Sequence, residues 1–237
     1  MSPHPHPPMA QPAEEPAQRS SGPVDKPGEL LIWTNVAEGF EYDFNRWYDE
    51  EHMVERAAIG GFVFAHRYRA LSGPRRYLAL YQTVSIGVFT SEAYRQAFTR
   101  QTDWSVRNFQ RMRDTQRRVN RVAPILGAGT GSALGLIELP AQSDIVRAAE
   151  LLTSGAPIPG LLGARALDPD AALSTPLPGA AAPVLRPCIV LEATERGAVT
   201  CAADRIVGGL RLDPAAASLF VLIWSLRSAD LRPPGVA

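Results

Sequence analysis

Hydrophobic and polar positions along the first half of the chain predict strands and helices in turn. The run 29–36 is almost continuously apolar, which is typical of a buried strand. Residues 40–58 place apolar and aromatic side chains at helical spacing, and a Gly-Gly pair at 60–61 ends that helix. Extended runs follow at 62–71 and 77–85, joined by the turn signal Ser72-Gly73-Pro74-Arg75. A second helix is predicted over 91–113, and a closing strand over 116–126.

The second half repeats this order in a weaker form. Its pattern predicts strands at 133–139, 161–167, 188–193 and 219–226, and helices at 144–152 and 199–209. The Pro/Ala-rich stretch 168–187 indicates an enlarged hairpin loop, since its composition favours neither strand nor helix. Residues 59–65 align with 158–164 without a gap. We therefore predict a tandem repeat, based mainly on the matching order of elements.

These elements predict an α+β fold of two ferredoxin-like (βαββαβ) repeats, at 29–130 and 131–230. Helices would cover one face of each sheet, and we expect the two bare faces to pack against each other within the chain. Segment 1–28 is dominated by Pro, Ala, Ser, Gln and His, so we predict a disordered tail there, and a short tail at 231–237.

Charge and cysteine content limit the possible functions. The chain has 24 basic and 24 acidic residues, which argues against a nucleic-acid partner. Arginines gather between positions 95 and 121, but such runs are typical of a solvated helix face. Cys188 and Cys201 form no Cys-x-x-Cys pair, and we predict buried free thiols in a reducing compartment. With no export signal, and no apolar run long enough to cross a bilayer, we expect a cytoplasmic protein without a membrane partner.

His52 is the leading candidate for chemistry. On a helix, Tyr48 and Arg56 lie one turn to either side of it, and Asp49 and Glu55 lie three residues away. A carboxylate on one ring nitrogen would raise the basicity of the other, as a general acid/base requires. The alternative is a structural histidine between helix and sheet. We name His52, Asp49, Glu55 and Tyr48 as the candidate catalytic set.

Further polar and aromatic residues are candidates for substrate binding. If 62–71 is a regular strand, His66 and Arg67 face opposite sides, so only one of them faces a given cavity. Arg67 either pairs with the acidic helix or holds a substrate carboxylate or enolate. We predict no metal site, because the two histidines outside the N-terminal tail, His52 and His66, lie on different elements. The candidate substrate-binding residues are Trp33, Asn35, Arg67, Tyr68, Tyr81 and Trp104.

The segment around His52 resembles the EthD-like branch of the dimeric α/β-barrel superfamily. The resemblance rests on Trp47-Tyr48-Asp49-Glu50-Glu51-His52, then Glu55-Arg56, Gly60-Gly61-Phe62 and Arg67-Tyr68. Gly60 stands where the family usually has proline, which affects the turn rather than the chemistry. The resemblance implies that two such units form a barrel, here within one chain. It also implies a pocket between sheet and helices, but it names no reaction.

From these features we predict a cofactor-independent lyase or isomerase. Its substrate would be a small apolar, aromatic or carbonyl-bearing molecule, and its reaction a decarboxylation, cyclisation, isomerisation or elimination with His52 as general acid/base. One alternative is a haem-binding monooxygenase or peroxidase with His52 or His66 as axial ligand. Another is a non-catalytic protein that binds a hydrophobic ligand. We expect a pseudo-dimeric monomer or a homodimer, with the second half, which lacks a similar cluster, serving only as built-in barrel partner.

Overall fold

The computed structural model describes residues 25–176, 182 and 184–231. The tails predicted at 1–28 and 231–237 therefore lie outside the described residues, except for 25–28 and 231. No helix in the described part of the chain is long and apolar enough to span a membrane.

The first half alternates strands and helices as the sequence predicts. Its elements are β1 (Gly28–Val36), α1 (Glu41–Trp47), a π-helical turn (Tyr48–His52), α2 (Met53–Ala57), β2 (Phe62–Ser72), β3 (Tyr77–Thr83), a 3₁₀ turn (Ile86–Thr90), α3 (Glu92–Thr99), α4 (Asp103–Arg111) and β4 (Met112–Gly127).

The second half follows with fewer but longer helices. Its elements are β5 (Ala133–Glu138), α5 (Asp144–Thr153), β6 (Leu161–Pro169), β7 (Cys188–Ala193), α6 (Arg196–Leu210), a 3₁₀ turn (Pro214–Ala216), β8 (Ala217–Arg227) and a final 3₁₀ turn (Ser228–Asp230). Between β6 and β7 the described residues form neither helix nor strand, in line with the predicted loop.

The eight strands close into one antiparallel barrel in the order β1-β3-β2-β8-β5-β7-β6-β4. The halves join edge to edge: β2 pairs with β8, and β4 pairs with β6. The barrel within one chain, which the resemblance implied, is confirmed. The prediction that the two sheets pack against each other by their bare faces is corrected. Edge pairing gives hydrogen-bond partners to the outer strands of both halves, and their bare faces become the lining of a single barrel.

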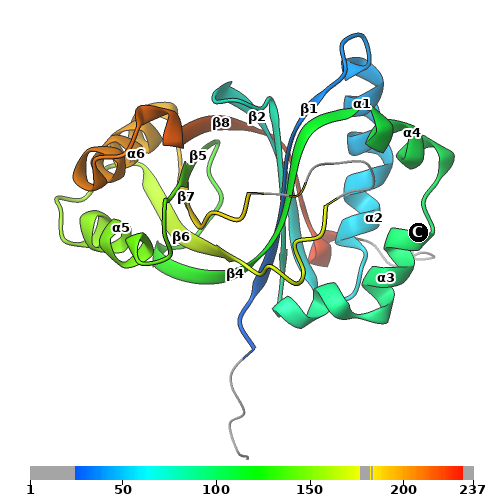
Figure 1. Ribbon diagram of the computed structural model, residues 1–237, viewed down its shortest axis with the longest axis horizontal. Coiled ribbons are helices and arrows are strands. Elements are labelled where there is room, and N and C mark those ends of the chain that lie inside the picture. The colour runs from blue at the N-terminus through cyan, green and yellow to red at the C-terminus, as the bar shows by residue number, and fades with distance from the viewer. Residues whose placement is uncertain (1–24, 177–181, 183, 232–237) are drawn as a thin grey trace, which may run out of the picture.

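Helices flank the barrel on two opposite sides (Figure 1). α1 to α4 cover the first half, and the core beneath them is rich in aromatic rings, including Phe44, Trp47 and Tyr81. α5 and α6 cover the second half over an aliphatic core of Ala, Ile, Leu and Val. A third cluster, with Trp33 and Phe220 at its centre, fills the inside of the barrel.

The helix predicted over 91–113 and the start of the strand that follows it need correction. The helix expected over 91–113 is two helices, because Thr102 caps α4 by accepting a hydrogen bond from the Ser105 backbone N–H (3.0 Å). β4 then begins at Met112, four residues earlier than expected. The first helix does end at the Gly-Gly pair, where Gly61 has a φ of 93° and a Cβ would lie 2.6 Å from Val88.

Candidate functional site

The π-helical turn Tyr48–His52 directs its buried side chains toward the first-half sheet. It lies between α1 and α2 without breaking the helix, and Tyr48 and His52 are both buried. Single π-turns of this kind are frequent at functional sites. The preceding Trp47 is fixed by a hydrogen bond from its Nε1 to Ser105 Oγ (3.0 Å), which ties this helix to α4.

His52 lies among aromatic rings and is only 5% exposed. Its ring centroid is 4.3 Å from that of Trp47, 5.2 Å from Tyr48 and 5.6 Å from Phe109. Its Nδ1 is buried and has no hydrogen-bond partner among the described residues. Burial, and then the positive charge of Arg56, hold the pKa of His52 well below its usual range. The imidazole is therefore neutral at physiological pH.

A cavity of about 30 Å³ lies beside His52, between the sheet and the helices. A volume of this size holds about one water molecule or the headgroup of a ligand. Its walls are formed by Leu30, Ile32, Tyr48, His52, Arg56, Tyr81, Tyr94, Phe98, Phe109, Met112 and Arg117.

Two buried guanidinium groups face this cavity without a carboxylate partner. Arg56 and Arg117 are each 5% exposed, and neither forms a salt bridge within the described parts of the chain. Arg56 donates to the carbonyl of Ala97 (3.2 Å). Arg117 donates to the Leu173 and Thr175 carbonyls and, through Nη2, to the Tyr94 hydroxyl (3.1 Å). The cavity is therefore positively charged.

Two phenols complete the polar wall. Burial raises the pKa of Tyr48 and raises that of Tyr81 well above its usual range, so both stay protonated and can donate hydrogen bonds. The Tyr81 hydroxyl donates a weak bond to Met53 Sδ at 3.4 Å, and its interaction with the Tyr48 hydroxyl also contributes to its raised pKa. Of the predicted site residues, the structure brings His52, Tyr48 and Tyr81 together here.

The carboxylates predicted as partners of His52 lie elsewhere. Asp49 accepts a hydrogen bond from Arg67 (3.1 Å), whose guanidinium also stacks on Tyr48 at 4.3 Å from the ring centroid. Glu55 is exposed, and its pKa is raised by partial burial and by Glu51. The predicted histidine–carboxylate pair is thus not formed, because Arg67 takes Asp49 and Glu55 points to solvent.

The other predicted residues are distributed around the molecule. Trp33 and Tyr68 line the inside of the barrel, and Asn35 bonds the hairpin backbone at Pro74 and Arg76. Trp104 donates from Nε1 to Asp43 (3.2 Å) between α4 and α1. None of these residues, nor Arg67, lines the cavity beside His52.

The sequence reasoning missed Arg117 and gave Arg56 no role. Arg117 belongs to the arginine run interpreted above as solvated surface. The sequence feature that could have indicated its burial is its position beside Arg118 in an extended segment. Strand residues alternate between the two faces of a sheet, so one of two adjacent arginines must point under the helices when they cover one face. Arg117 does so, and Arg118 points to the other side, where it pairs with Glu138.

Comparison with known proteins identifies the fold. No family model matches the sequence, and no curated protein matches it. Among solved structures, an anthrone oxidase-like protein matches with a TM-score of 0.55 at 11% identity, over 90% of this chain and 97% of that one. The chain has the dimeric α/β-barrel fold.

Two further structures share this barrel. A candidate monooxygenase from Fusobacterium nucleatum matches with a TM-score of 0.54 at 8% identity, over 86% of this chain and 95% of that one. A candidate chlorite dismutase matches with a TM-score of 0.52 at 7% identity, over 84% and 95%. At such identities the likeness is one of fold, and the EthD-like branch stays a prediction.

Two predictions are corrected by this comparison. The cofactor-independent lyase or isomerase is contradicted, because the matched barrels are described as an oxidase-like protein, a monooxygenase and a chlorite dismutase. These descriptions fit the haem-binding alternative better. The predicted absence of a cofactor is contradicted for the same reason. The cavity beside His52 does not fit a haem, however: it measures about 30 Å³, which is close to the volume of one water molecule and far too small for a porphyrin ring.

Proposed function

We propose that this chain is an oxidoreductase that binds a small aromatic anion in the cavity beside His52. The observation that carries the proposal is the pair Arg56 and Arg117, buried at one cavity with no carboxylate partner among the described residues. Burying a charge without a partner is costly, so buried cations are normally paired. A carboxylate, phenolate or enolate group of a ligand would provide the missing charge.

The surrounding side chains fit such a ligand. The cavity accommodates a charged headgroup, and the half-buried rings of Phe98 and Phe109 offer contacts for the body of the molecule. Tyr48 and Tyr81 can donate hydrogen bonds to the oxyanion. Neutral His52 can accept a hydrogen bond rather than act as a strong base, because burial, and then the nearby guanidinium groups, lower its pKa.

The oxidoreductase class is supported by the descriptions of the matched barrels. In the proposed reaction the bound anion loses two electrons. The electrons, with two protons from the substrate and solvent, pass to dioxygen, which leaves as hydrogen peroxide, or to hydrogen peroxide, which leaves as two water molecules. Arg56 and Arg117 would position the electron-rich group and limit its contact with water. No step is assigned to a haem in this cavity.

Salicylate and its uncharged relative salicyl alcohol test the anion site by calorimetry. We expect salicylate to bind more tightly. Arg56→Gln or Arg117→Gln should weaken it about 10- to 100-fold, since a hydrogen bond to a charged group contributes about 1.5–3 kcal/mol. Arg107→Gln on the exposed face of α4 is the matched control. Equal salicylate affinity in all three variants would contradict the site.

Oxygen uptake and peroxide consumption over a panel of phenolic acids and enolisable aryl ketones test the reaction class. Oxidation of at least one compound, with a raised KM in Arg56→Gln and an unchanged KM in Arg107→Gln, is the expected result. Anion binding without any oxidation would refute the oxidoreductase assignment and favour a ligand-binding protein.

The finer structural predictions belong with this proposal. We infer that 29–130 and 131–230 are tandem ferredoxin-like repeats, supported by the order β4-β1-β3-β2 in one half and β8-β5-β7-β6 in the other. The cytoplasmic location, and the choice between a pseudo-dimeric monomer and a homodimer, stay predictions of the sequence.

A further inference from the structure

A second and much larger cavity opens at one end of the barrel. It has a volume of about 610 Å³, within the range of cofactor and ligand sites. Both halves of the chain form it, and most of its walls are apolar or backbone. The lining is Pro27, Val63, Phe64, His66, Gln82, Val122, Pro124, Gly127, Ala128, Gly129, Thr130, Gly163, Ala164, Arg165, Glu192, Ser225 and Arg227. We call it the barrel mouth.

His66 lines the barrel mouth from β2, on the face of the sheet opposite to the cavity beside His52. Its ring stacks on Phe64 at 4.0 Å with an interplanar angle of 9°, which fixes its orientation. Imidazole nitrogens are the commonest metal ligands in proteins.

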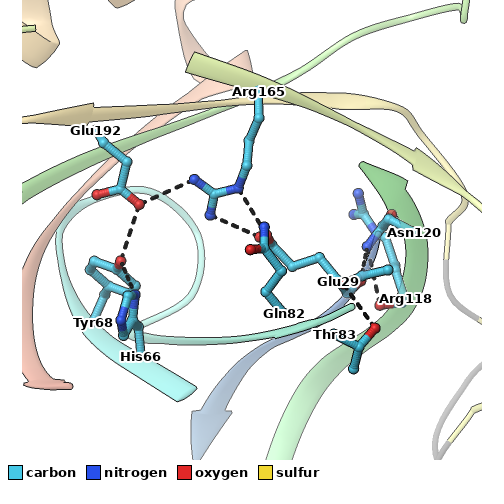
Figure 2. Close-up of polar contacts among 10 residues, drawn as sticks. Glu29, His66, Tyr68, Gln82, Thr83, Arg118, Asn120, Arg165 and Glu192 are labelled. Atoms are coloured by element: carbon cyan, nitrogen blue, oxygen red, sulfur yellow. Dashed lines mark hydrogen bonds and ion pairs between the residues drawn. The ribbon is translucent and has the colours of Figure 1, made fainter. Parts of the chain in front are cut away.

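A hydrogen-bond chain selects the tautomer of His66 (Figure 2). Tyr68 donates its hydroxyl to Glu192 Oε1 (3.3 Å), and the same hydroxyl lies 3.4 Å from His66 Nδ1. A tyrosine hydroxyl carries a single proton. With that proton directed at Glu192, the hydroxyl oxygen accepts from Nδ1–H, and Nε2 retains its lone pair.

We propose that the barrel mouth is a haem site in which His66 Nε2 is the iron ligand. The residues present fit the group in three respects: the volume, the mainly apolar walls, and a histidine oriented by a tyrosine and a carboxylate, as ligating histidines commonly are. Arg227, exposed at the rim, is placed to contact a propionate. Bound there, a haem would supply one-electron and oxygen chemistry.

This site is independent of the proposed anion site. The two cavities share no lining residue, and they lie on opposite faces of the first-half sheet. Of the two histidines predicted as possible axial ligands, only His66 lines a cavity of sufficient volume. A negative result for haem binding at the barrel mouth would therefore leave the salicylate test unaffected, and the reverse also holds.

Titration of the full chain with hemin, followed by the Soret band, tests the proposal. We expect saturation at one hemin per chain. His66→Ala should lose the spectrum of the ligated form, and added imidazole should restore it by occupying the vacated position. His52→Ala, the matched control, should titrate like the unchanged protein. Tyr68→Phe should keep a ligated spectrum but weaken binding by about tenfold, the lower end of effects of partners that orient metal ligands.

A second variant tests the same site in case His66→Ala does not fold. Ala128→Trp places a large ring in the exposed loop at the barrel mouth, leaves His66 in place, and should block hemin binding. Absence of a saturable Soret change in the unchanged protein would overturn the proposal. A spectrum that depends on His52 but not on His66 and Ala128 would also overturn it.

Discussion

Replacing Arg165 by methionine is expected to lower the free energy of unfolding by several kcal/mol, and so to shift the unfolding transition to lower urea concentrations. Arg165 donates to Glu29 through Nε (2.8 Å) and Nη2 (2.9 Å), and to Glu192 through Nη1 (3.2 Å). The side chains of Glu29 and Glu192 are 0% and 3% exposed. Arg165→Met keeps most of the volume but leaves two carboxylates inside the barrel without their cation. Removing one partner of a buried ion pair costs about 3–5 kcal/mol, and we expect the upper half of that range.

Urea denaturation followed by circular dichroism measures this loss, with Arg121→Met as the control. Arg121 pairs with Asp170 at the surface and is 46% exposed, so its loss should cost less than about 1 kcal/mol. Adding Glu29→Gln and Glu192→Gln to Arg165→Met should recover part of the stability, because no unpaired charge then remains.

The pH dependence follows from the raised pKa of Glu192, whose main cause is burial. A carboxyl group with a raised pKa binds more protons in the folded than in the unfolded state. Its burial therefore lowers the free energy of unfolding once the pH rises above the usual pKa of a carboxyl group, and this loss disappears on acidification. The penalty of Arg165→Met should therefore shrink between pH 7 and about 4. A cost close to that of Arg121→Met, or one that does not change with pH, would refute the reasoning.

Two further changes test the barrel interior. Phe220→Ala removes a ring that is 0% exposed and packs edge-on against Trp33 at 6.3 Å; it should lower the free energy of unfolding by about 3–5 kcal/mol in urea, and a loss under about 1 kcal/mol would mean that this core is not close-packed. His66 has a pKa lowered to about 4, so the unfolded chain binds its proton first and stability should fall as pH drops below about 6.5, by up to roughly 3 kcal/mol from this residue. His66→Gln should remove this part of the slope, and identical slopes in both proteins would contradict the burial of a neutral ring.

Local patterns predicted the elements better than they predicted the partners of particular side chains. The buried strand at 29–36, the hairpin at 72–75 and the helix around His52 depend on short-range periodicity and turn chemistry, which a sequence displays directly. The grouping of His52 with Tyr48 followed from one helical turn of spacing. The partner of Asp49 did not, because Arg67 lies 18 residues away on a strand whose packing under the helix is a tertiary property.

The resemblance implied a barrel within one chain, but residue patterns did not predict how the edges of the two halves join. Whether β2 pairs with β8, or two finished sheets stack, depends on edge-to-edge registers such as Arg67 with Trp224 and Pro124 with Arg165. Sequence alternation fixes only which residues share a face. The burial of Arg117 was missed for the same reason, since an arginine-rich segment looks solvated until the helices that cover the strand are placed.

Closure also changes the role of the second half. Its helix-covered face is aliphatic, which agrees with the view of this half as a structural partner only. In the barrel interior, however, the second half also contributes polar contacts. Arg165 on β6 binds Glu29 of the first half and Glu192 on β7. Glu192 in turn accepts from Tyr68, whose hydroxyl contacts His66. Strand alternation sends His66 and Tyr68 inward and Arg67 outward. The second half therefore supplies charge to a site that neither sheet could form alone, and a chain cut to 29–130 should lose the barrel mouth.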